Sequence, residues 1–196
     1  HQLNWTILNW ILRDLARWQR TAADPVPIAI NLSAGQLTDP VLPQQILSAL
    51  DQHDLPSSLL HIEITEDSVI ADINAARQVL QEIKGARIEI SLDDFGTGYS
   101  SLSLLRDLPL HRLKLDKSFI DRIDRNSRAI KIARLAIDFA HELDMKVIAE
   151  GIESRDQADI LRGLGCDYAQ GFYWARPMPA SEFESYWLRR NRTKAS

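Results

Sequence analysis

Short apolar segments alternate with segments of helical spacing along almost the whole chain, and this alternation limits the fold more than any other feature. Between the strand-length apolar runs, apolar residues recur every three or four positions. Such an order predicts parallel βα units. The expected strands cover residues 28–32, 60–65, 87–92, 112–115, 146–149 and 168–170, the expected helices cover 2–20, 43–53, 72–84, 126–143, 155–164 and 181–189, and a loop with a short helix covers 93–109.

Two architectures contain such units, an open doubly wound sheet and a closed (β/α)₈ barrel. A single acidic residue after a strand usually caps the next helix or is solvated, but here every expected strand carries a polar residue at or just beyond its carboxyl end. In a barrel these side chains converge on one mouth, whereas in an open sheet they spread along an edge. The recurrence favours a barrel, and the residues concerned are Asn31, Glu63, Glu66, Asp93, Asp94, Lys114, Asp116, Glu150 and Gln170.

The chemistry of this set is that of a hard cation. Carboxylates with one amide oxygen are the ligands that Mg²⁺ or Mn²⁺ prefers, and neither His nor Cys is needed. The adjacent carboxylates of Asp93 and Asp94 repel each other unless a cation lies between them or one turns away. Lys114, between Leu113 and Leu115, is either a strand-edge lysine or a protonated group inside the mouth that orients a water or a phosphate.

A Gly-x-Gly pair at Gly96 and Gly98 follows the third expected strand, and Asp116 lies about 20 residues further on, as in a dinucleotide-binding fingerprint. We reject that interpretation because Ser101 replaces the third glycine and because two carboxylates just before the turn would repel a pyrophosphate. The glycines are better explained as the bend of a loop close to a ligand.

Composition excludes several classes of protein. A formal net charge of -4 and an isoelectric point near 5.7 argue against binding to a DNA or RNA polymer. The single cysteine, Cys166, cannot form an internal disulfide, which favours a cytoplasmic location. No apolar run approaches the roughly 18 residues of a membrane span, and no signal peptide opens the chain.

The polar motifs resemble, in order and spacing, those of the EAL domains, bacterial phosphodiesterases that hydrolyse cyclic di-GMP. The resemblance covers nearly the whole chain. It rests on Asn31-Leu32-Ser33, Glu63-Ile64-Thr65-Glu66, the run from Asp93-Asp94-Phe95-Gly96 to Leu102, Lys114-Leu115-Asp116, Glu150-Gly151-Ile152-Glu153, and Gln170-Gly171-Phe172 leading to Pro177.

The resemblance implies a modified TIM barrel in which two Mg²⁺ or Mn²⁺ ions activate water for attack on cyclic di-GMP, with linear pGpG as the product. It further implies a homodimer in which the loop 94–102 carries part of the contact. The implied metal ligands are Asn31, Glu63, Asp93 (bridging), Asp94 and Glu150, the implied catalytic residues are Lys114, Glu150 and Glu66 (which steadies that loop), and the implied substrate-binding residues are Gln170, Asp116 and Pro177.

One departure is serious. The Glu-Ala-Leu tripeptide that names the family is absent, and only six strands are expected where a barrel of about 250 residues has eight. We therefore expect residues 1–196 to be one barrel domain that lacks its first strands and belongs to a larger signalling protein. An upstream sensory or GGDEF-type domain, or a membrane anchor elsewhere in the parent, would be compatible with this. The competing functions are a receptor that binds cyclic di-GMP without cleaving it and a different metal-dependent barrel enzyme.

Overall fold

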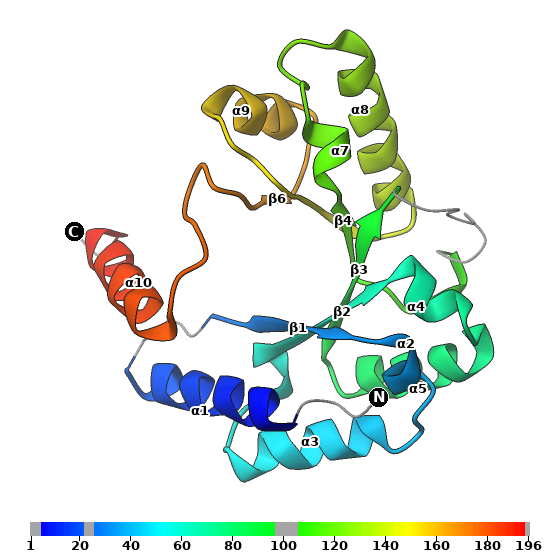
Figure 1. Cartoon of the computed structure of the whole chain (residues 1–196), viewed down its shortest axis with the longest axis vertical. Helices are drawn as coiled ribbons and strands as arrows, with labels where there is room; N and C mark the ends of the chain where they lie inside the picture. The colour runs from blue at the N-terminus through cyan, green and yellow to red at the C-terminus, as the bar shows by residue number, and fades with distance from the viewer. Residues whose placement is uncertain (1–4, 22–25, 97–105, 195–196) are drawn as a thin grey trace.

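The computed structural model describes residues 5–21, 26–96 and 106–194, and its centre is a parallel sheet of six strands (Figure 1). The strands follow one another across the sheet in chain order, as they do in a barrel. A doubly wound sheet would reverse its strand order. The strands are β1 (Ile28–Leu32), β2 (Leu60–Thr65), β3 (Glu89–Phe95), β4 (Arg112–Leu115), β5 (Lys146–Ala149) and β6 (Tyr168–Ala169).

Helices connect the strands and lie mainly on the outer side of the curved sheet (Figure 1). Over the described ranges β1 and β6 do not pair, so the sheet does not close. The helices are α1 (Trp5–Thr21), α2 (Ala34–Leu37), α3 (Leu42–Gln52), α4 (Glu66–Ile70), α5 (Ile73–Gly85), α7 (Lys117–Ile120), α8 (Ser127–Glu142), α9 (Arg155–Gly163) and α10 (Ala180–Lys194), with a 3₁₀ turn at Ser57–Leu59.

The two faces of the sheet differ in polarity because side chains alternate along each strand. On β2, Ile62 and Ile64 are fully buried, and the intervening Glu63 is only partly buried. On β4, Leu113 and Leu115 are fully buried on either side of Lys114. The apolar residues form the core with the helices, which leaves the polar residues together on the other face.

The barrel-type parallel fold predicted from the sequence is confirmed, and most elements agree within two residues at their ends. Four details were wrong. The last helix, expected over 181–189, continues to Lys194 as α10. Asp93 and Asp94 lie within β3 rather than in a loop after it, β6 ends at Ala169, and the short helices α2, α4 and α7 were not expected. Much of the expected loop over 93–109 falls in residues 97–105, outside the described ranges.

Two helices distant in sequence contact each other at the open side of the sheet. The rings of Trp18 on α1 and Phe183 on α10 have centroids 5.0 Å apart, and Arg17 pairs with Glu184 at 3.2 Å. In the portion of the chain that the structure describes, no helix is both long enough and apolar enough to cross a bilayer.

Candidate active site

Lys114 lies at the centre of the polar face. Its side chain is only 5% exposed, and its Nζ atom is 2.9 Å from Glu63 Oε2, 2.9 Å from Asp93 Oδ1 and 2.8 Å from Glu150 Oε1. The three acids come from β2, from β3 and from the residue after β5. Four segments that are distant in sequence thus deliver one ammonium and three carboxylates to one point at the carboxyl ends of the strands.

This arrangement determines which groups carry charge. Burial on its own lowers the pKa of Lys114, but the hydrogen bonds to Glu150, Glu63 and Asp93 outweigh it, so the pKa lies above its ordinary value. Burial raises the pKa of Glu150, although the pairing with Lys114 opposes this rise. Lys114 therefore stays protonated throughout the physiological range.

The two adjacent aspartates lie in a β-bulge of β3. Leu92 pairs with Leu113 and Phe95 pairs with Leu115, so Asp93 and Asp94 together stand opposite Lys114 alone. Asp94 adopts φ 55°, a left-handed conformation that Asp tolerates better than most residues, and its N–H donates to Asp93 Oδ1 at 3.0 Å. Burial and the charges of Asp93 and Asp116 raise the pKa of Asp94. The bulge directs Asp93 toward Lys114 and gives Asp94 a different direction.

Glu66 is the first residue of α4 and is 5% exposed. Its Oε1 accepts a hydrogen bond from the Gly96 N–H at 3.4 Å, immediately after β3. Gly96 has φ +92°, and a Cβ there would lie 2.2 Å from the ring of Phe119. Glu66 and Phe119 thus both contact the start of the loop at Gly96. The rest of that loop, and the dimer contact expected on it, fall in residues 97–105, outside the described ranges.

Gln170 and Pro177 lie on the side of the site that faces β6. Gln170 Nε2 donates to Glu150 Oε1 at 2.5 Å, which connects Gln170 directly to the carboxylate cluster. A cavity of about 450 Å³ begins here, and Glu150, Gln170 and Pro177 are among its lining residues. These two predicted residues therefore share one concave surface with Glu150.

Asn31 and Asp116 have less central positions. Asn31 is exposed on the edge strand β1 and stands beside Glu63 in the strand register. Asp116 is the N-cap of α7, and its Oδ1 accepts a hydrogen bond from the Ser118 N–H at 2.8 Å, which contributes to lowering its pKa. Asp116 is thus partly committed to a helix cap.

The donor set fits a hard cation in chemistry, because Asn31, Glu63, Asp93 and Asp94 offer only oxygen atoms. The geometry is less direct. Within residues 5–21, 26–96 and 106–194, no three His, Cys, Asp or Glu side chains form a ready-made metal cluster. The Lys114 ammonium lies among three of these carboxylates instead, and it neutralises part of the charge that a cation would meet.

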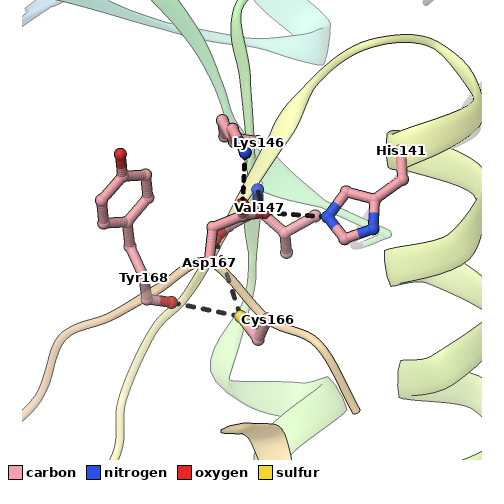
Figure 2. A network of polar contacts seen from close by, with 6 residues as sticks. All are labelled: His141, Lys146, Val147, Cys166, Asp167 and Tyr168. Atoms are coloured by element: carbon pink, nitrogen blue, oxygen red, sulfur yellow. Dashed lines mark hydrogen bonds and ion pairs between the residues drawn. The ribbon is translucent and has the colours of Figure 1, made fainter.

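Figure 2 shows a second polar cluster, which sequence reasoning missed; its residues include the starts of β5 and β6, at the ends of the strands opposite to Lys114. Asp167 accepts hydrogen bonds from His141 Nε2 at 2.8 Å, from Lys146 Nζ at 2.8 Å and from the Val147 N–H at 2.9 Å. Burial raises the pKa of the adjacent Cys166 thiol to about 11. Because this cluster surrounds the amino ends of β5 and β6, it is separate from the candidate active site.

Parallel strands in chain order define a TIM-barrel-type α/β domain, and the charged cluster lies at the face that carries the active site in enzymes of this fold. An EAL domain family model matches residues 1–177, and the chain belongs to the EAL domain family.

Curated relatives are much longer than this chain. The signaling protein YkoW of Bacillus subtilis is 41% identical over 180 residues, which are 90% of this chain and 22% of that protein. A protein of Pseudomonas aeruginosa named cyclic di-GMP phosphodiesterase NbdA is 36% identical over 185 residues, 94% of this chain and 24% of that protein. The chain thus spans less than a quarter of either relative.

Solved structures share the fold. A c-di-GMP complex of the P. aeruginosa phosphodiesterase MucR superposes with a TM-score of 0.82 at 36% identity and covers 91% of this chain and 74% of that one. The EAL domain of Mycobacterium smegmatis DcpA gives 0.88 at 32%, with coverage of 93% and 82%. A calcium and c-di-GMP complex of Klebsiella pneumoniae BlrP1 gives 0.77 at 28%, with coverage of 86% and 42%.

Proposed function

We propose that this domain hydrolyses cyclic di-GMP to linear pGpG in a reaction that requires Mg²⁺ or Mn²⁺. The observation that carries the proposal is the convergence of Glu63, Asp93 and Glu150 on one buried lysine at the mouth of the sheet. Relatives named as cyclic di-GMP phosphodiesterases and a neighbour solved with c-di-GMP support the choice of substrate.

In this proposal the metal ions are held by oxygen ligands from four strands, namely Asn31, Glu63, Asp93, Asp94 and Glu150. When bound, such ions lower the pKa of a water and neutralise charge on the phosphate. Hydrolysis forms a bond between the water oxygen and phosphorus, breaks the bond from phosphorus to one ribose 3′ oxygen, and delivers a proton to that oxygen. A linear product with one 5′ phosphate results.

The side chains of the domain orient the reactants. Lys114, which stays protonated, would position the attacking water through its positive charge, or through an N–H group released when a carboxylate turns to a metal ion. Glu66 steadies the backbone after β3 through the Gly96 N–H, so that Asp93 and Asp94 keep their positions. Gln170, Asp116 and Pro177 line the surface that receives the dinucleotide.

The wider assignments are also proposals. We infer a parent signalling protein with a sensory or GGDEF-type domain, because the relatives are about four to five times longer than the segment matched here. We also infer a homodimer, which rests on the family resemblance. The free thiol of Cys166 is compatible with a reducing cytoplasm.

The decisive test is turnover of cyclic di-GMP by the full-length protein with Mg²⁺ or Mn²⁺, with pGpG measured by chromatography. Asp93→Asn, which keeps the shape and removes the charge, should lower kcat at least 100-fold and leave the circular dichroism spectrum unchanged. Asp159→Asn, an exposed carboxylate on α9, is the matched control and should retain full activity. If the protein binds cyclic di-GMP but forms no pGpG, it is a receptor for cyclic di-GMP and not an enzyme. Full turnover by Asp93→Asn would refute the role of Asp93.

A further inference from the structure

The cavity beside Glu150 has a second wall that the proposed chemistry does not use. Glu150 and Gln170 form the wall nearest to Lys114, and Phe172, Arg176 and Pro177 lie on the wall formed by the segment after β6. Its volume of about 450 Å³ is in the range of small-molecule pockets. A ligand bound at the carboxylates would therefore extend over these three residues.

Arg176 and Phe172 form a stacked pair on that wall. The guanidinium carbon of Arg176 lies 4.5 Å from the centroid of the Phe172 ring, and both side chains are exposed. The pKa of Glu153 is lowered mainly by its pairing with Lys117 at 2.5 Å and less by the charge of Arg176, so this carboxylate is already engaged. Over the residues that the structure describes, Arg176 forms no ion pair of its own, so its donor edge stays available for a ligand.

The backbone that carries this pair is fixed to the loop after Glu150. The Ile152 N–H donates to Gln170 O at 3.1 Å, and the Tyr173 N–H donates to Ile152 O at 3.0 Å. Gly171 packs so closely that a Cβ there would lie 2.1 Å from Ile152 O. The backbone of the stacked pair is thus fixed relative to Glu150. Binding of a ligand therefore need not order this segment, which lowers the entropic cost of binding.

The chemistry of the pair selects a purine with two adjacent acceptors. An aromatic ring and a planar guanidinium both stack on bases. The guanidinium also donates two parallel hydrogen bonds, which match O6 and N7 of guanine, whereas adenine presents a donor in place of O6.

Resting on the proposed function, we propose that Arg176, oriented by Phe172, binds one guanine of the cyclic dinucleotide and discriminates it from adenine. The two residues act on recognition and not on the bond that breaks.

The test compares cyclic di-GMP with cyclic di-AMP in the full-length protein. Arg176→Gln should lower kcat/KM for cyclic di-GMP by about 5- to 100-fold, mainly through KM, and should leave the low value for cyclic di-AMP unchanged. Arg176→Lys, which keeps the charge and loses the planar fork, should resemble Arg176→Gln. Phe172→Leu should raise KM for both dinucleotides, and Arg125→Gln, an exposed arginine after α7, should change neither.

Three outcomes overturn this proposal. An equal loss with both dinucleotides upon Arg176→Gln would mean a phosphate contact. Retention of the preference by Arg176→Lys would mean that the planar guanidinium is not what distinguishes guanine from adenine. An unchanged KM would mean that the pair touches no ligand. If the wild type produces no pGpG, the proposed hydrolysis fails separately. The same variants then test guanine recognition by equilibrium binding of the two dinucleotides.

Discussion

Lys114 and its three carboxylates depend on one another for their ionised states. Burial on its own lowers the pKa of Lys114, and three acids this close would repel one another without the ammonium. The charges also differ in number, since one cation faces three anions. The residual negative charge is the physical reason to expect a divalent cation at this face.

The first residue-scale prediction concerns the loss of this ammonium. Lys114→Met keeps the length and removes the charge, so it should lower the free energy of unfolding by about 3 kcal/mol at pH 7 with a chelator present. Acid should reduce the deficit, because the carboxylates that now repel one another bind protons as pH falls. Denaturant titrations at pH 7 and pH 5 measure both effects.

The isosteric comparison is Lys146→Met, which removes an exposed ammonium at the other end of the strands. The loss in the free energy of unfolding should be smaller for Lys146→Met than for Lys114→Met, and it should be the same at pH 7 and pH 5. A Lys114→Met deficit that is equal at both pH values would contradict electrostatic repulsion as its cause and would indicate lost packing.

At the scale of secondary-structure elements, the bulge in β3 and the cluster around Asp167 both position strand residues. They lie at opposite ends of the strands. Because of the bulge, the side chains of the adjacent residues Asp93 and Asp94 point in different directions. Asp167 connects the end of α8 to the starts of β5 and β6 (Figure 2). Neither feature depends on a pattern of apolar residues. The bulge sets the register of β3 against β4, and the Asp167 hydrogen bonds hold the starts of β5 and β6 together.

Asp167→Asn should lower the free energy of unfolding by about 1–2 kcal/mol, a modest value because His141 and Lys146 are partly exposed to solvent. Hydrogen bonds from Lys146 and His141 hold the pKa of Asp167 at about 2, below the ordinary 3.8, although burial opposes this. The stabilisation is therefore complete above pH 4 and is lost as pH falls toward 2.

Urea titrations between pH 7 and pH 2.5 check this dependence. Asp159→Asn on α9 serves as the control, since surface pairs of this kind contribute only about 0.3–0.5 kcal/mol. A wild-type-minus-Asp167→Asn difference that does not shrink in acid would show that the carboxylate charge contributes nothing.

At the scale of the whole molecule, the sheet has a well-supported centre and two weaker sides. The strands β2, β3 and β4 each pair on both sides, and their leucine and isoleucine side chains are fully buried. In the described ranges β1 pairs only with β2, and β6, which has two residues, pairs only with β5. Stability should therefore decrease from the centre of the sheet toward both sides.

Amide hydrogen exchange on the 196-residue chain tests this gradient. The amides of Ile62, Ile64 and Leu92 should exchange slowest, near the rate set by global unfolding, because their strands open only when the core opens. The amides of β1 and β6 should exchange faster, by about 10-fold or more. Protection of Ala169 equal to that of Ile62 would contradict the gradient.

The alternation of apolar runs and helical spacing was enough to predict the parallel fold, because short buried strands and amphipathic helices are local patterns. It was also enough to select the polar residues at the strand ends. It could not predict the bulge. The bulge places two residues of β3 opposite Lys114, and this depends on the register between β3 and β4, which no local pattern specifies. Arg176 was missed for a similar reason, since its stacking on Phe172 is a contact through space.

The sequence by itself determined the fold class, the family motifs and the list of acids, because each depends on residue type and spacing along the chain. The tertiary structure decided that Lys114 lies inside the mouth rather than at a strand edge, that Asp116 caps α7, and that Glu150 shares a cavity with Arg176. The Asp116 cap is local, but the contacts of Lys114 join residues 21 to 51 positions apart, and the cavity joins Glu150 to a residue 26 positions away. Only the packing of the strands and helices brings those segments together.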